Sequence, residues 1–135
     1  MLDERVDRLY AAARDVRNRA HAPYSKFKVG AAVLDNQGQI HVGCNVENAS
    51  YPEGVCAEAN ALGAMVAAGG MACQLVVICA GDNKTITPCG GCRQKLAEFS
   101  TPETPVISFS ANGNQVLQTT LGDLLPHGFS ASDFK

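Results

Sequence analysis

The stretch LVVICA, at residues 75–80, is a continuous apolar run that ends at Gly81. It holds three β-branched residues and no charged side chain, which is typical of a central strand covered on both faces. Such a strand needs helices above and below its sheet, because a single layer of helices would leave one face in water. The run therefore predicts an α/β fold in which helices lie on both faces of a sheet.

The N-terminal part of the chain supplies a helix and a hairpin. Apolar residues recur at three- and four-residue steps over residues 6–20, which predicts an amphipathic helix that ends before Pro23. Two apolar runs, 29–34 and 40–44, flank the turn sequence NQG at 36–38. This pattern predicts two antiparallel strands joined by a tight turn.

Residues 56–68 are helix formers or small, and a Gly-Gly pair follows them as a stop signal. This helix would connect the 40–44 strand to the 75–80 strand, and we expect the crossover to be parallel and right-handed. Apart from Glu58 and Asn60 it is apolar on every side. One sheet cannot bury such a helix all round, so its outer face is expected to pack on another subunit.

The C-terminal part predicts a helix and a second hairpin. A helix is expected over residues 89–99, and a short terminal helix or turn around residues 124–125. Strands at 106–110 and 115–121 enclose Asn-Gly at 112–113, the strongest short hairpin signal, so the last two strands should be antiparallel. The whole order predicts one mixed five-stranded sheet with helices on both faces.

Composition limits the classes of function. The chain has 135 residues, of which 46% are hydrophobic, and this suits a single domain over residues 1–135. Thirteen acidic residues against eleven basic ones, with no basic run, argue against a nucleic-acid partner. No stretch approaches the roughly 20 apolar residues that span a bilayer, and the charged N-terminus does not suit a signal peptide. We expect a cytoplasmic protein without a membrane partner.

Six cysteines need an explanation other than disulfides, which a cytoplasmic protein with a core of ordinary size does not require. Cys44, Cys73 and Cys79 lie in apolar, strand-like runs and are expected to be small buried hydrophobes. The other three sulfurs lie at expected helix starts: CAE at 56–58 and PCGGC at 88–92. Those are the candidates for chemistry.

The pair Cys89 and Cys92 fits either a metal site or a redox pair when taken alone. Cys56 favours metal, because it also opens a helix and should project from the same edge of the sheet. Three protein ligands with the fourth position left to water are typical of catalytic zinc. A closed structural zinc would need a fourth ligand, for which only Cys44 is available.

Glu58 lies two residues beyond Cys56, in an apolar helix where a buried carboxylate is costly without a partner or a task. The simpler interpretation is that the Glu58 carboxylate only stabilises the start of the helix, because its negative charge lies near the positive end of the helix dipole. Beside a metal-activated water it would instead serve as general base and general acid.

The spacing of CAE and PCGGC is that of the three-cysteine zinc deaminase signature. Further stretches extend the pattern along nearly the whole chain: YSKFKVGAA at 24–32, NVENASY at 45–51, CRQ at 92–94 and LLP at 124–126. With these motifs the chain resembles the cytidine deaminases that act on free nucleosides. The resemblance implies a three-layer α/β/α sandwich around a five-stranded sheet, which agrees with the order of elements predicted above.

The resemblance also implies roles for particular residues. One Zn²⁺ per subunit would be held by Cys56, Cys89 and Cys92, and Glu58 would move protons during deamination of the cytosine ring at C4. Cytidine and deoxycytidine would become uridine and deoxyuridine, with release of ammonia, in pyrimidine salvage. Phe27 would stack on the pyrimidine.

Other implied roles concern the ribose, the base edge and the neighbouring subunit. Asn45 and Glu47 would bind the ribose 3′-hydroxyl, and the backbones of Ala57 and Cys89 would bind the base edge. Relatives with three cysteine ligands usually form homotetramers, in which residues matching Ala49, Tyr51 and Phe129 reach a neighbour's active site. On physical grounds too, the Glu47 carboxylate favours a neutral nucleoside, since it would repel a phosphate.

One position departs from the family pattern. Many relatives place an arginine immediately after the catalytic glutamate to offset the charge of the thiolates, whereas this chain has Ala59 there. Our hypothesis is that the two helix N-termini, with Arg93 or Asn60, take over this role.

Four other functions remain to be separated from cytidine deamination. A relative acting on a modified cytosine nucleoside and an editing deaminase acting on RNA or DNA share the chemistry. A zinc-stabilised interaction domain and a redox protein share only the cysteines.

Overall fold

The computed structural model describes residues 3–134 and contains one five-stranded sheet with the order β2-β1-β3-β4-β5. The elements, in chain order, are α1 (Glu4–Arg17), β1 (Val29–Asp35), β2 (Ile40–Cys44), the 3₁₀ turn η1 (Tyr51–Glu53), α2 (Ala57–Ala67), β3 (Cys73–Ala80), α3 (Gly90–Glu98), β4 (Pro105–Phe109), β5 (Val116–Thr120), α4 (Leu121–Leu124) and the 3₁₀ turn η2 (Ala131–Phe134). No helix among the described residues has the length and apolar character needed to cross a membrane.

The sheet is mixed, as predicted. β1 pairs antiparallel with both β2 and β3, β3 pairs parallel with β4, and β4 pairs antiparallel with β5. β2 and β3 therefore run in the same direction, but β1 lies between them. The connection through α2 thus passes over β1 and joins two parallel strands that are not neighbours.

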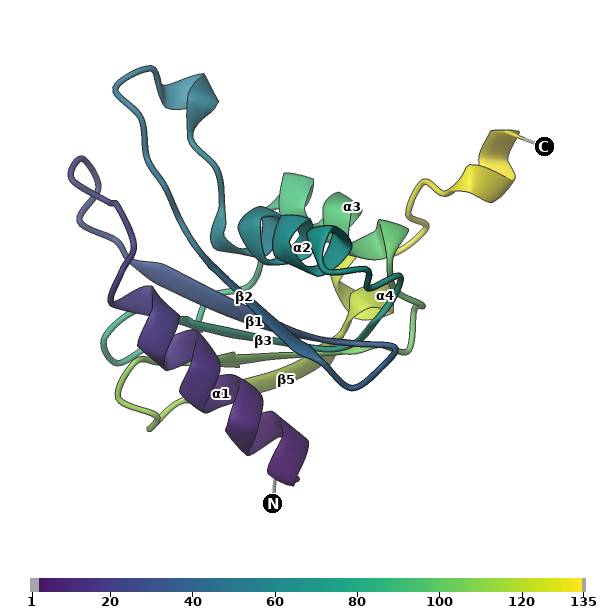
Figure 1. Cartoon of the computed structure of the whole chain (residues 1–135), viewed down its shortest axis with the longest axis horizontal. Coiled ribbons are helices and arrows are strands. Elements are labelled where there is room, and N and C mark those ends of the chain that lie inside the picture. The colour runs from purple at the N-terminus through teal and green to yellow at the C-terminus, as the bar shows by residue number, and fades with distance from the viewer. Residues whose placement is uncertain (1–2, 135) are drawn as a thin grey trace.

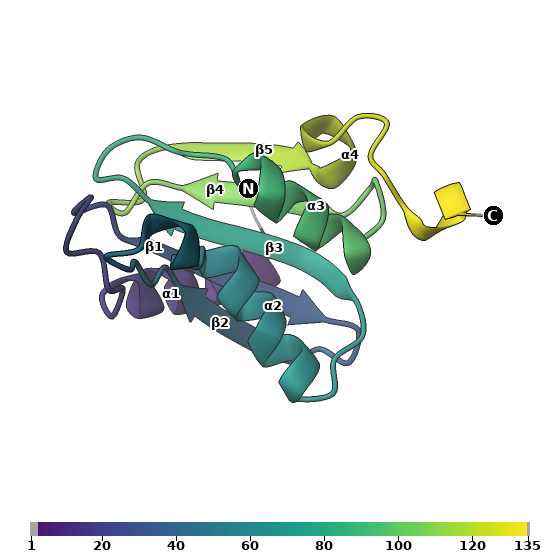
Figure 2. The same ribbon diagram turned by 90° about the horizontal axis from the view of Figure 1, so that it is seen from above.

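Helices cover both faces of the sheet (Figures 1 and 2). α1 packs on one face and buries Val6, Leu9 and Ala13 against side chains of β1, β3 and β4. α2 and α3 lie on the other face, where Met65 and Leu96 join the buried residues of the same strands. Every residue of β1 is buried, and all but one of β3, which confirms that the run at 75–80 belongs to a strand covered on both sides.

Two glycines let the helices approach the sheet closely. A Cβ at Gly30 of β1 would overlap the carbonyl of Ala13 in α1. A Cβ at Gly43 of β2 would lie 2.5 Å from the Ala57 carbonyl oxygen in the first turn of α2. Backbone therefore packs directly on backbone at Gly43, and this contact fixes where α2 begins.

Two local expectations differ from the structure. α1 ends at Arg17 rather than at residue 20, because the chain turns there and His21 forms a bridge with Val46. Cys44 is only half-buried, since it ends an edge strand, whereas Cys73 and Cys79 are buried as expected. Burial raises the pKa of the Cys73 thiol to about 11, so it remains a neutral apolar group.

Asp35 anchors the β1–β2 hairpin from inside the protein. It is 2% exposed, and its carboxylate accepts hydrogen bonds from Gln37 N at 2.8 Å, Gln39 N at 2.9 Å and His41 Nε2 at 2.8 Å. These bonds, led by the one from His41, hold the pKa of Asp35 below its usual range.

This carboxylate predicts an acid-sensitive contribution to stability. Because the pKa of Asp35 is lower in the folded than in the unfolded chain, its contribution is complete above the unfolded value of about 4 and is lost as pH falls through the folded value. We expect Asp35→Asn to unfold more easily than wild type at pH 7 and the difference to shrink below pH 4. Urea unfolding at a series of pH values measures this. A difference independent of pH would contradict the assignment.

Candidate active site

Three sulfur atoms meet where two helices begin. Cys56 caps the N-terminus of α2, Cys89 caps the N-terminus of α3, and Cys92 lies in the first turn of α3. Their Sγ atoms all lie within 4.8 Å of one another, and those of Cys56 and Cys89 are 4.0 Å apart. Tetrahedral zinc with Zn–S bonds of ~2.3 Å requires S···S separations of roughly 3.8 Å. The three thiols therefore fit a Zn²⁺ ion with little adjustment.

The arrangement favours an open metal site. Within residues 3–134, the group of potential ligands around these sulfurs contains only the three cysteines. Cys44, the one candidate for a closed structural zinc, does not belong to the group. Three protein ligands leave a fourth position for water, as in catalytic zinc sites.

The surroundings of the sulfurs differ in their effect on ionisation. Burial raises the pKa of both Cys56 and Cys92, with a further contribution from the negative charge of Glu58. A hydrogen bond from the Cys92 backbone amide lowers the pKa of Cys89. Zinc binds thiolates, so loading the site must release protons, and zinc affinity must rise with pH.

Glu58 lies in the first turn of α2 and is 4% exposed. Burial raises the pKa of its carboxyl group above the usual value for glutamate. A carboxyl group with a raised pKa is a stronger base than an ordinary glutamate, which suits a general acid–base residue better than a simple helix cap.

A pocket of about 200 Å³ opens beside the sulfurs. Its walls include Val29, Asn45, Cys56, Ala57, Glu58, Ile86, Thr87 and Cys89. Ligand pockets that enclose a whole small molecule usually measure at least ~300 Å³. The space suits one small ring, and the rest of a nucleoside would need walls from elsewhere.

The structure brings only some of the predicted substrate residues to this pocket. Asn45 and Ala57 line it. Phe27 is exposed and lines a different pocket, and Asn45 holds the segment from Phe27 to Val29 in place. Its Nδ2 donates to Phe27 O at 2.9 Å, and its Oδ1 accepts from Val29 N at 2.8 Å.

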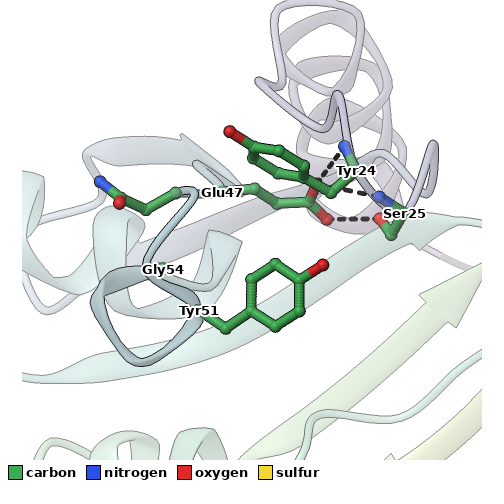
Figure 3. Close-up of a pocket in the computed structure, with 6 residues that line it drawn as sticks. Tyr24, Ser25, Glu47, Tyr51 and Gly54 are labelled. Atoms are coloured by element: carbon green, nitrogen blue, oxygen red, sulfur yellow. Dashed lines mark hydrogen bonds between the residues drawn. The ribbon is translucent and has the colours of Figure 1, made fainter.

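Glu47 lies in a second pocket of about 340 Å³, together with Tyr24, Ser25, Tyr51 and others (Figure 3). Its carboxylate accepts hydrogen bonds from Ser25 Oγ, from Tyr24 N at 3.0 Å and from Ser25 N at 3.1 Å. The bond from the Ser25 hydroxyl is the main cause that lowers the pKa of Glu47, which therefore stays ionised. Sequence reasoning missed Tyr24 and Ser25, whose only signal was their place in a motif before a strand.

Of the three residues predicted to reach a neighbour, Ala49 is exposed and the two aromatic residues are strongly exposed. Tyr51, in η1, is 76% exposed, and Phe129 is 56% exposed. Figure 1 shows that η1 and the segment that carries η2 both project away from the sheet. Neither residue lines the pocket beside the sulfurs.

Arg93 and Asn60 make contacts other than the ones we hypothesised. Arg93 donates from Nε to Pro88 O at 2.7 Å, from Nη1 to Leu124 O at 2.8 Å and from Nη2 to Thr87 Oγ1 at 2.8 Å. Asn60 Nδ2 donates to Cys44 O at 2.8 Å. None of these four bonds reaches a sulfur, so the two helix N-termini remain the source of positive potential at the thiolates.

Comparisons with known proteins agree with this site. A family model described as the cytidine and deoxycytidylate deaminase zinc-binding region matches residues 3–108. The chain is 39% identical to a cytidine deaminase of Sporosarcina psychrophila over 128 residues, which cover 95% of this chain and 93% of that protein. A crystal structure of cytidine deaminase from Burkholderia pseudomallei has a TM-score of 0.86 and 40% identity, covering 95% of this chain and all of that one. The enzyme from Mycobacterium tuberculosis gives a TM-score of 0.80 and 36% identity, with coverage of 92% and 96%.

The contacts of Arg93 predict a role in holding the metal ligands in position. Its three bonds tie the turn just before Cys89 to α4, so Arg93→Ala should lower zinc affinity by roughly 10- to 100-fold, the usual effect of losing a group that orients ligands. Arg93→Lys keeps the charge but not the planar set of donors, so its zinc affinity should lie between those of wild type and Arg93→Ala. Competition with a chromophoric chelator measures the affinity. Arg19→Ala, which removes an exposed ion pair with Asp15 just beyond the end of α1, is the control, and wild-type affinity in Arg93→Ala would contradict the role.

Proposed function

This chain belongs to the zinc-dependent cytidine and deoxycytidylate deaminase family, and we propose from that premise which of its residues carry the reaction. It is a hydrolase that converts cytidine and deoxycytidine to uridine and deoxyuridine and releases ammonia, a reaction of pyrimidine salvage. One observation supports the assignment most strongly: Cys56, Cys89 and the buried carboxyl group of Glu58 line the same small pocket, and the Cys92 sulfur lies within 4.8 Å of the other two sulfurs.

Cys56, Cys89 and Cys92 hold one zinc ion per subunit. When bound, this ion supplies a Lewis acid that lowers the pKa of a coordinated water. The helix N-termini of α2 and α3 stabilise the three thiolates, because each places the positive end of a helix dipole beside them. The fixed N-cap positions of Cys56 and Cys89 orient the sulfurs before the metal arrives.

Glu58 transfers the protons of the reaction. Its carboxylate accepts a proton from the attacking water and passes it to N3 of the cytosine ring. It then accepts the proton of the new C4 hydroxyl group and donates it to the departing amine, which leaves as ammonia. The raised pKa of Glu58 supports both directions of transfer, because a weaker acid is a stronger base.

Substrate contacts come from two neighbouring pockets. Asn45 and the Ala57 backbone border the ring pocket, and Phe27, two residues before Val29 of its wall, would stack on the pyrimidine. Glu47 accepts three hydrogen bonds from its own subunit, and a carboxylate has about four acceptor sites, so one remains for a ribose hydroxyl. Its lowered pKa keeps a negative charge there, which supports a free nucleoside over a nucleotide.

The active chain is a homotetramer. The ring pocket is small and open, and Tyr51 and Phe129 extend from the subunit where a neighbour would use them. An apolar groove between α2 and α3, lined by Ala59, Leu62, Gly63, Val66 and Phe99 among others, fits the expectation that α2 packs on another subunit. A monomer in solution at micromolar concentration would exclude this assembly.

Residues 1–135 act as one catalytic domain in the cytoplasm. A single sheet supplies both hydrophobic cores, so its two faces are expected to unfold together. All six cysteines are free, and a reducing compartment keeps zinc-binding thiols in that state. Zinc content and resistance to disulfide formation in purified protein would test this location against an oxidising one.

Replacing Glu58 separates the deaminase from a zinc-stabilised interaction domain. Glu58→Gln keeps the size of the side chain but removes its acid–base function, so the deamination rate of cytidine should fall by at least ~10²-fold. Zinc content and assembly should not change, because Glu58 is not a metal ligand. The loss of absorbance as cytidine becomes uridine measures the rate. Zinc-loaded wild type that does not deaminate cytidine, or a fully active Glu58→Gln, would overturn the proposal.

A further inference from the structure

A third pocket, of about 310 Å³, lies between the end of α1, residues 26–28 and the loop after β3. Four cationic side chains line it: Arg17, Lys26, Lys28 and Lys84. Asp82 is the one acidic residue in its walls. The chain as a whole carries a net charge of −2 and only 11 basic residues, so this pocket is a local concentration of positive charge in an acidic protein.

The walls of this cationic pocket are held in place by backbone contacts. Arg17, whose side chain is 18% exposed, donates from Nε to Lys28 O at 3.1 Å. Lys26 N donates to Ala22 O at 3.0 Å. On the opposite wall, Gly81 O accepts from Ala111 N at 2.7 Å, and Asp82 O accepts from Asn112 N at 3.3 Å. The cationic side chains are therefore attached to backbone segments that hydrogen bonds hold in place.

Lys26 adds evidence of a functional constraint. Its φ is +62°, in the left-handed region that disfavours residues with a Cβ. A glycine there would relieve the strain, yet the position carries a long cation at the rim of the pocket. Strained backbone of this kind is concentrated at ligand sites, where the surrounding structure holds it.

The cationic pocket shares a wall with the active site. Phe27 and Lys28 line the cationic pocket, and the next residue, Val29, lines the pocket beside the sulfurs. Asn45 binds the backbone of both Phe27 and Val29, so the two pockets lie on either side of one short segment.

We propose that this cationic pocket is a second binding site, which takes the phosphate groups of a nucleotide. Lysine and arginine side chains that line one cavity match the charge and the acceptor oxygens of a di- or triphosphate. Lys26 and Lys84 are present in addition to Lys28, whose Nζ donates to Asn18 O at 3.4 Å, and Arg17, which pairs with Asp82. The neutral substrate nucleoside has no group that would use them. Asp82 does not neutralise the positive charge of the pocket, because its 3.6 Å ion pair engages only Arg17 and its own side chain is 96% exposed.

Calorimetry on the zinc-loaded wild-type protein tests this site with three probes. Inorganic pyrophosphate, adenosine triphosphate and adenosine are used, since the purine avoids the small pyrimidine pocket. We expect both phosphate compounds to bind, more weakly as salt is raised, and adenosine not to bind. Tighter binding of the nucleotide than of pyrophosphate would support a nucleotide as the ligand. Equal affinity would identify free polyphosphate as the source of the phosphate groups.

Paired variants locate the binding. Lys26→Gln with Lys84→Gln should weaken both phosphate probes at least tenfold. Arg5→Gln with Arg8→Gln removes the same charge from the exposed start of α1, ~13 Å or more away along the helix, and should change neither. Cytidine deamination should be normal in both pairs, so a failure here would leave the deaminase assignment standing. Absence of phosphate binding, equal weakening in both pairs, or tighter binding of a single-stranded oligonucleotide than of the nucleotide would overturn the proposal.

Discussion

The close contact of α2 with β2 at Gly43 positions the whole active site. Backbone lies on backbone there, and a Cβ would come within 2.5 Å of the Ala57 carbonyl oxygen. Because that carbonyl belongs to the first turn of α2, the contact fixes Cys56 one residue earlier and Glu58 one residue later. α3 starts beside it and adds Cys89 and Cys92. The metal ligands and the proton carrier thus depend on how two helices meet one sheet, rather than on any single loop.

This geometry gathers negative charge in a small space. Three cysteine sulfurs lie within 4.8 Å of one another beside the Glu58 carboxyl group, and burial raises the pKa of Cys56, Cys92 and Glu58. No arginine follows Glu58, since that position is Ala59. Arg93 and Asn60 bind backbone and a threonine hydroxyl rather than the sulfurs. The positive ends of α2 and α3, together with the metal, must therefore stabilise the thiolates. Arg93 instead holds the turn before Cys89 in place against α4.

Much of this could be predicted from the sequence, because the signals were local. The apolar run at 75–80, the two turn sequences and the helix stop after residue 68 determined the sheet and its layers. Cys56 and the Cys89–Cys92 pair could be brought together because each opens a helix that follows a strand. The contacts of Arg93 could not be predicted, since one of its partners, Leu124, lies 31 residues away and is brought close only by the packing of α4. The separation of Phe27 and Glu47 into neighbouring pockets also depends on how loops fold against each other.

X-ray absorption at the zinc edge on purified protein tests the central claim most directly, because it counts the atoms bound to the metal. Three sulfurs at ~2.3 Å and one oxygen at roughly 2.0 Å are predicted, matching an open site held by Cys56, Cys89 and Cys92. Four sulfurs would mean that Cys44 closes the site and that zinc is structural. A protein that binds no zinc would contradict the account altogether.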